Sequence, residues 1–170
     1  MVAVRSRGSA VLAAALVFGL AVSACARHNA EESLTAGAGA GAVPAVGPGS
    51  LQEFNQTVGD RVFFDTDSTD LSPTAQATLE KQAQWLNRYG HYSFTIEGHA
   101  DERGTREYNF ALGARRAQTV HDYLAAKGVA ASRMRTISYG KERPVAVCDD
   151  ISCWSQNRRA VTVLNGAPSS

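Results

Sequence analysis

The order in which two hydrophobic periodicities alternate is the feature that most limits the folds open to this chain. Some segments are short apolar runs or alternate apolar and polar side chains, as strands do, whereas others repeat their apolar residues with helical spacing. The strand-like segments are residues 61–65, 92–97, 133–139 and 159–164, and the helical ones are residues 73–89 and 105–127. The order β-α-β-α-β-β predicts an α/β sandwich, with the helices on one face of a mixed four-stranded sheet.

The ends of the two helical segments carry residues that favour helix boundaries. Ser72 stands where a side chain can cap the first helix, and Pro73 follows at the first helical position, where a missing N–H costs nothing. Gly90 and Gly128 stand just beyond the last turns, where glycine is favoured. These signals fix the lengths predicted for both helices.

The second helical segment carries an arginine on its apolar stripe. At about 100° per residue, Arg116 lies roughly 40° from Leu112 and within the stripe that Val120 continues. Asn109, two turns before Arg116, faces the same way. A guanidinium on a core-facing stripe is costly unless it meets an anion, and Asp101 precedes the helix at the end of a strand. The pattern predicts a polar pocket at this corner, or alternatively a core salt bridge between Asp101 and Arg116.

Other charges near this corner are expected to face solvent. Asp101 itself is placed at a corner and not in the core, so reversing its charge is expected to leave the fold intact. Arg115 points about 100° away from Arg116. The residues expected to be solvated surface charges are Glu102, Arg103, Arg106, Glu107, Arg158 and Arg159.

The first 24 residues have the pattern of a secretory signal peptide. Arg5 and Arg7 precede an apolar run at residues 10–22, which is shorter than the roughly 20 residues that span a membrane. A signal anchor is the alternative. Residues 22–25 (VSAC) resemble the lipobox of bacterial lipoproteins, which implies that Cys25 becomes the mature N-terminus and carries acyl chains. In such proteins Ala26, in place of aspartate, implies delivery to the outer membrane.

Composition divides the remaining chain into three parts. Residues 25–50, rich in Gly, Ala and Pro, have almost nothing to bury and are predicted to be a tether. Residues 51–165 are predicted to be one folded domain, and residues 166–170 a tail. Removing Arg5 and Arg7 from the 17 basic residues leaves 15 against 16 acidic ones, so no broad basic surface for nucleic acid is expected.

The two cysteines of the domain are predicted to form a disulfide. With Cys25 assigned to lipid, Cys148 and Cys153 are left as a pair in an exported, oxidising compartment. A metal site is the alternative, but one C-x4-C without a second pair or an adjacent histidine matches poorly. His99 and Asp101 form an H-x-D pair without a third ligand. No metal and no cofactor are therefore predicted.

A phosphatase is the alternative function that the residues suggest. An apolar strand ending in Asp65-x-Asp67-x-Thr69 resembles the nucleophile motif of haloacid-dehalogenase-type phosphatases, with Asp65 as nucleophile and Asp67 as acid/base. Lys141 and the pair Asp149–Asp150 would then supply the remaining groups. The domain is short for that fold, and the acidic pair lies between two cysteines instead of at a strand end.

Residues 98–117 (GHADERGTREYNFALGARRA) resemble the signature of the OmpA-like peptidoglycan-binding domain, as found in the peptidoglycan-associated lipoproteins. The blocks VFFDTDSTDLSP, ISYGKERP and SQNRRAVTV resemble flanking parts of the same domain, so the resemblance covers about residues 55–164. It implies a domain that grips the diaminopimelate side chain of the stem peptide and cleaves nothing. The ligand-binding positions it implies are Asp101, Arg116, Asn109 and Leu112, with the backbone around Phe64, Asp65 and Thr66 closing the site.

The resemblance also implies partners and a location. It predicts an outer-membrane lipoprotein whose domain faces the periplasm and binds peptidoglycan, so that the chain tethers the outer membrane to the wall. Such proteins belong to the Tol–Pal system of envelope integrity and cell division. They contact the periplasmic propeller protein TolB, and other Tol proteins are possible partners. Because that contact overlaps the wall site, wall-bound and TolB-bound states are expected to exclude each other.

Overall fold

The computed structural model describes residues 47–166. The predicted signal peptide, Cys25 and residues 25–46 of the predicted tether lie outside this range, as do residues 167–170 of the tail. Among the described residues, no helix combines the length and the apolar character needed to cross a membrane.

Four strands form one mixed sheet, as the sequence predicts. The strands are β1 (Arg61–Phe63), β2 (Phe94–His99), β3 (Met134–Gly140) and β4 (Arg159–Leu164), in the spatial order β1-β4-β2-β3. β2 and β3 are parallel, whereas β4 lies between β1 and β2 and is antiparallel to both. The last strand therefore inserts into the middle of the sheet. β2 begins and ends two residues later than predicted.

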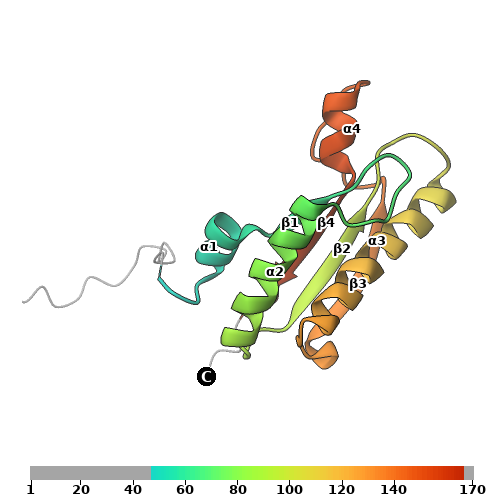
Figure 1. Ribbon diagram of the computed structural model, residues 1–170. Helices are drawn as coiled ribbons and strands as arrows, with labels where there is room; N and C mark the ends of the chain where they lie inside the picture. The colour runs from blue at the N-terminus through green and yellow to red at the C-terminus, as the bar shows by residue number, and fades with distance from the viewer. Residues whose placement is uncertain (1–46, 167–170) are drawn as a thin grey trace, which may run out of the picture. The chain divides into compact units, whose positions relative to one another are not determined.

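The two long helices lie across one face of the sheet (Figure 1). α2 spans Pro73–Arg88 and α3 spans Arg106–Ala126. The Ser72 side chain accepts from the Ala75 N–H at the start of α2, and the Thr105 side chain accepts from the Tyr108 N–H at the start of α3. The predicted layer arrangement is thus confirmed.

Four short helical segments were not predicted: α1 (Leu51–Glu53), the wider turn η1 (Phe54–Gly59), the 3₁₀ turn η2 (Ala131–Arg133) and α4 (Ile151–Asn157). Long-range contacts hold α1 and η1 in place. The Trp85 indole donates to the Glu53 carboxylate over 2.7 Å, and the Phe54 and Trp85 rings lie 4.9 Å apart. Such contacts stabilise helices too short to be marked by periodicity.

The core lies between the sheet and the two long helices. Fully buried side chains include Leu79, Leu86, Phe94, Ile96 and Leu124. α3 approaches β2 most closely where Gly113 faces Gly98: a Cβ on Gly98 would overlap the Gly113 carbonyl, and one on Gly113 would lie 2.5 Å from the Ser138 hydroxyl oxygen. This close packing sets the position of α3 against the strand that leads to Asp101.

Substituting Gly98 by alanine is expected to lower the free energy of unfolding by about 1–3 kcal/mol, because α3 must move away from β2. Gly90→Ala is the matched control, since a Cβ there meets nothing within 4 Å. Urea denaturation measures both changes. Equal stability of the two variants would contradict the close approach.

Candidate functional site

A polar pocket of about 280 Å³ lies where the sequence predicts one, at the turn from β2 into α3. β2 ends at His99, the chain turns through Gly104 with φ +87°, and α3 begins after Thr105. This turn brings the loop after β1, the start of α3 and the residue before β4 together. The pocket is lined by Thr66, Asp67, Asp101, Arg103, Gly104, Tyr108, Asn109, Leu112, Arg116 and Arg158.

Asp101 is the buried anion of the pocket. Its Oδ1 accepts from the backbone N–H and Nε of Arg103, and its Oδ2 accepts from Arg103 Nη2 at 2.7 Å and Arg158 Nη1 at 3.3 Å. Burial raises the pKa of Asp101, but the hydrogen bonds from Arg103 and Arg158 outweigh burial and leave its pKa below the ordinary value. The carboxylate is therefore ionised at neutral pH.

Arg116 is fully buried, and it does not form the core salt bridge with Asp101 that was the alternative prediction, because Asp101 pairs with Arg103 and Arg158. Its Nε, Nη1 and Nη2 donate to the carbonyl oxygens of Ser68, His99 and Asp65 at 2.9, 2.8 and 3.1 Å. Burial lowers the pKa of Arg116 to about 10, and nearby Arg158 adds to the shift. The guanidinium remains charged at neutral pH, and it fixes the loop after β1 against the end of β2.

The prediction that Arg158 and Arg159 are surface charges is wrong. Both are buried. The Arg158 carbonyl accepts from the Phe64 N–H in the loop after β1, and Arg159 begins β4, which lies between β1 and β2. Arg158 donates to the Phe64 carbonyl at 3.0 Å as well as to Asp101, and Arg159 donates to the carbonyls of Asn157 and Arg143. Because β4 lies between β1 and β2, its first residues are inside the fold. The local pattern of charged residues does not predict this placement.

Arg103 is also not a simple surface charge. Its side chain is 40% exposed and forms an ion pair with Asp101. The Trp154 ring lies under its guanidinium, 4.1 Å from ring centroid to Cζ. The hydrogen bonds that Arg103 donates to Asp101 raise the pKa of Arg103.

The other predicted site residues divide into two groups. Asn109 and Leu112 are buried and line the pocket, and Asn109 donates to the Arg103 carbonyl at 2.7 Å; Thr66 lines the opposite side. The side chains of Phe64 and Asp65 instead line a separate pocket. Their backbones still belong to the site, since their carbonyls accept from Arg158 and Arg116.

Tyr108 and Asp67 also line the pocket, although neither was among the predicted ligand-binding residues. The Tyr108 hydroxyl donates to the Asp67 carboxylate, and this bond raises the pKa of Tyr108. Asp67 has φ +55°, a left-handed conformation that is uncommon outside glycine. The signal that could have found Tyr108 is its place in the first turn of α3, next to Asn109.

The predicted phosphatase groups do not converge. Asp65 and Asp67 line different pockets. The Lys141 ammonium donates to the backbone carbonyls of Glu102 and Gly104 at 3.0 and 2.7 Å. Lys141 and Asp149 both line a third pocket, beside Cys148, and neither Asp65 nor Asp67 lines it.

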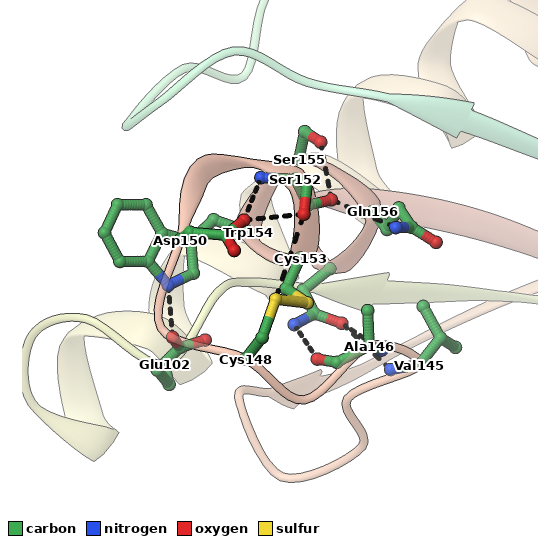
Figure 2. The surroundings of a disulfide bond; sticks show 11 residues. Glu102, Val145, Ala146, Cys148, Asp150, Ser152, Cys153, Trp154, Ser155 and Gln156 are labelled. Carbon is green, nitrogen blue, oxygen red and sulfur yellow. Dashed lines mark hydrogen bonds between the residues drawn. A yellow bond between two sulfur atoms is a disulfide. The ribbon is translucent and has the colours of Figure 1, made fainter.

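Cys148 and Cys153 are joined by a disulfide, with their Cα atoms 5.7 Å apart (Figure 2). Among residues 47–166, Cys148, Asp150 and Cys153 are grouped closely enough to hold a metal ion, but the two sulfurs are bonded to each other. The bridge ties the first turn of α4 to the preceding loop.

His99, next to the site, is a buried imidazole. It is 1% exposed, stacks on Tyr139 at 5.6 Å, and neither ring nitrogen has a hydrogen-bond partner within residues 47–166. Burial lowers the pKa of His99 to about 4, and Arg159, Arg143 and Arg61 add to this shift. The ring is neutral at pH 7, which argues against a role as a cation in the site.

The pKa of His99 predicts a loss of stability in mild acid. The unfolded chain protonates His99 near pH 6.5 and the folded chain only near pH 4, so folding weakens as pH falls through this window. The loss is on the order of 3 kcal/mol. Urea denaturation at a series of pH values measures it. His99→Phe is expected to flatten the curve, whereas substitution of exposed His91 by glutamine leaves it unchanged; an unchanged slope in His99→Phe would contradict the assignment.

Comparison with known proteins assigns the family. The sequence model of the OmpA family matches residues 63–158. A protein of Rhizobium meliloti named peptidoglycan-associated lipoprotein is 66% identical over 91% of this chain and 88% of its own length. The protein of that name in Agrobacterium fabrum is 61% identical over 95% of this chain and 90% of its own length.

Solved structures agree with the fold. The peptidoglycan-associated lipoprotein of Burkholderia pseudomallei has a TM-score of 0.63 and 41% identity, over 65% of this chain and 96% of that chain. The C-terminal domain of MotB from Helicobacter pylori has a TM-score of 0.60 at 21% identity, over 64% of this chain and 86% of that chain, and this likeness concerns the fold alone.

The described residues 47–166 belong to one compact unit with its own core. The Burkholderia structure consists almost wholly of the part that matches, so a protein of residues 41–170 is expected to fold on its own. These relatives carry the name of a lipoprotein associated with peptidoglycan, and the prediction of a protein that is not an enzyme agrees with that name. From the family match and the high identity over nearly the whole length, the chain belongs to the OmpA family and, within it, to the peptidoglycan-associated lipoproteins.

Proposed function

We propose that the chain binds peptidoglycan non-covalently by gripping the free end of diaminopimelate in its stem peptides. The observation that carries this proposal is that one pocket of about 280 Å³ is lined by both Asp101 and Arg116. The free end of diaminopimelate bears an ammonium and a carboxylate on one carbon. Its receptor therefore needs one fixed anion and one fixed cation close together.

Each group of the ligand has a partner in the pocket. Asp101, ionised and held by Arg103 and Arg158, receives the ammonium. A guanidinium has five N–H donors, so Arg116 keeps two after serving three backbone carbonyls, and these bind the carboxylate. Leu112 covers the hydrocarbon chain of the ligand. The Asn109 side chain donates to the Arg103 carbonyl and so stabilises the turn between β2 and α3. Phe64, Asp65 and Thr66 close the site with their backbone.

The rest of the chain makes this binding site a mechanical link. Acylation of Cys25 after removal of residues 1–24 anchors the N-terminus in the outer membrane, and residues 25–50 let the domain reach the wall from the periplasmic side. The domain is residues 51–165, followed by a short tail at 166–170. The names of the relatives, peptidoglycan-associated lipoprotein, support this arrangement.

We further propose a place for the chain in the Tol–Pal system. The propeller protein TolB, and other Tol proteins, would contact a surface that overlaps the pocket, so that TolB and peptidoglycan compete. Capture of TolB by the lipoprotein while it is saturated with peptidoglycan would count against this competition.

Cosedimentation with purified sacculi tests the binding proposal. The unit of residues 41–170 is expected to sediment with sacculi and to be displaced by meso-diaminopimelate. Nα-acetyl-lysine amide, whose ammonium has no carboxylate on the same carbon, is expected not to displace it. Arg106→Ala, on the exposed face of α3, serves as the control variant and is expected to sediment like the unchanged unit. If the unchanged unit stays in the supernatant, the proposal fails.

A further inference from the structure

The Arg103 guanidinium is held rigidly yet has one unused edge. Its Nε and Nη2 donate to Asp101 at 3.1 and 2.7 Å, which fixes the plane of the group. The Trp154 ring lies against its face, 4.1 Å away. Within residues 47–166 its Nη1 has no hydrogen-bond acceptor, and the side chain is 40% exposed while lining the pocket.

Trp154 belongs to α4, and contacts of this helix fix its position. Its indole N–H donates to the Glu102 carboxylate, which fixes the edge of the ring (Figure 2). The face of the ring packs against Arg103. α4 is clamped at both ends. At its start the Cys148–Cys153 disulfide joins it to the preceding loop, and the Asp150 side chain caps Ser152. At its end Asn157 accepts from the N–H groups of Val145 and Ala146 and donates to the Ala146 carbonyl.

We propose that Arg103 is a second anion-binding residue of this site, positioned by the disulfide-braced helix α4, and that it selects peptides carrying another carboxylate beside diaminopimelate. A planar guanidinium that is already held needs little further ordering to bind a carboxylate. Asp101 and Arg116 take the ammonium and carboxylate of the zwitterionic end, which leaves the free edge of Arg103 for a carboxylate on the adjoining residue. The inference rests on the proposed function, because it concerns the same pocket.

Two synthetic peptides separate the second carboxylate from the first. One is γ-D-glutamyl-meso-diaminopimelate with the α-carboxylate of glutamate free, and the other carries a carboxamide at that position. Calorimetry on the unit of residues 41–170 is expected to show about tenfold tighter binding of the free acid, since a charge-assisted hydrogen bond is lost in the amide. The measured quantity is the ratio of the two dissociation constants.

Variants assign that ratio to Arg103 and its supports. Arg103→Gln is expected to bring the ratio to about one. Trp154→Ala, and the double change Cys148→Ser with Cys153→Ser, are each expected to reduce it severalfold; Trp154→Phe, which keeps a ring against Arg103, restores most of it. Gln156→Ala, on the exposed side of α4, is the matched control and keeps the ratio.

The ratio distinguishes positioning from a merely structural effect, because general loosening of the fold weakens both peptides equally. Equal affinity of the unchanged unit for the two peptides would overturn the role of Arg103 and leave the proposed function standing. A ratio that survives in the Cys148, Cys153 double variant and in Trp154→Ala would overturn the role of α4. Failure of both peptides to bind the unchanged unit would instead refute the proposed function.

Discussion

Arg116→Ala is expected to abolish binding to peptidoglycan and to lower the free energy of unfolding by about 3–6 kcal/mol. The substitution removes a donor from three carbonyls. The Asp65 carbonyl keeps the Ser68 N–H, whereas those of Ser68 and His99 lose the guanidinium, and each unsatisfied buried group costs about 1–3 kcal/mol. It also leaves a cavity beside Phe64, whose ring lies 5.1 Å from the guanidinium carbon. Urea denaturation and sacculus cosedimentation measure the two effects.

Two neighbouring substitutions sharpen this test. Arg115→Ala removes an equal charge from the exposed side of the same helix and is expected to change neither quantity. Arg116→Lys keeps the charge but cannot reach three carbonyls with one ammonium, so it is expected to recover only part of the stability. If Arg116→Ala were as stable as Arg115→Ala, the buried guanidinium would not be holding the loop after β1.

Asp101→Asn is expected to weaken binding of diaminopimelate about 100-fold, the upper end of what one charge-assisted bond contributes, because the ammonium loses its anion and meets Arg103 and Arg158 uncompensated. Stability is expected to fall by about 3 kcal/mol, since Arg158, 7% exposed, is left as a buried cation without its partner. Calorimetric titration and urea denaturation measure these changes. Asp70→Asn, at an exposed carboxylate of the neighbouring loop, is the control and is expected to bind normally.

The same contacts change the expectation for charge reversal at this position. The sequence places Asp101 at a corner where Asp101→Lys leaves the fold intact, but the structure buries the carboxylate between two arginines. A lysine there would put three cations together, so Asp101→Lys is expected to unfold at a much lower urea concentration than Asp101→Asn. Loss of binding in that variant alone would therefore say little about the ligand.

Hydrophobic periodicity predicted the sheet and both long helices because those elements bury one regular face each. β4 begins and ends at the predicted residues. α3 begins at Arg106, one residue after the predicted start at Thr105. The short helices escaped prediction for a physical reason. α1 and α4 are stabilised by contacts with residues far along the chain, such as Glu53 with Trp85 and Trp154 with Glu102, and they carry no stripe of their own.

The candidate site was predictable where one residue violates a local pattern. Arg116 is out of place on an apolar stripe, and that anomaly leads to the pocket that Asp101 and Asn109 also line. Arg158 violates no such pattern, because an arginine before a strand is ordinary on a surface. Only the insertion of β4 between β1 and β2 brings Arg158 within hydrogen-bonding distance of Asp101. The order in which strands pair is not encoded in the local spacing of residues.

Titration of the isotope-labelled unit of residues 41–170 with meso-diaminopimelate, followed by NMR, tests the central claim most directly. Saturable shifts are expected at the side-chain N–H groups of Arg116 and Arg103 and at the backbone N–H groups of Thr66 and Gly104. These shifts should be absent in Asp101→Asn at the same ligand concentration. Saturable shifts confined to the separate pocket lined by Phe63, Asp65 and Asp70, or no saturable shift at all, would contradict the assignment of this site.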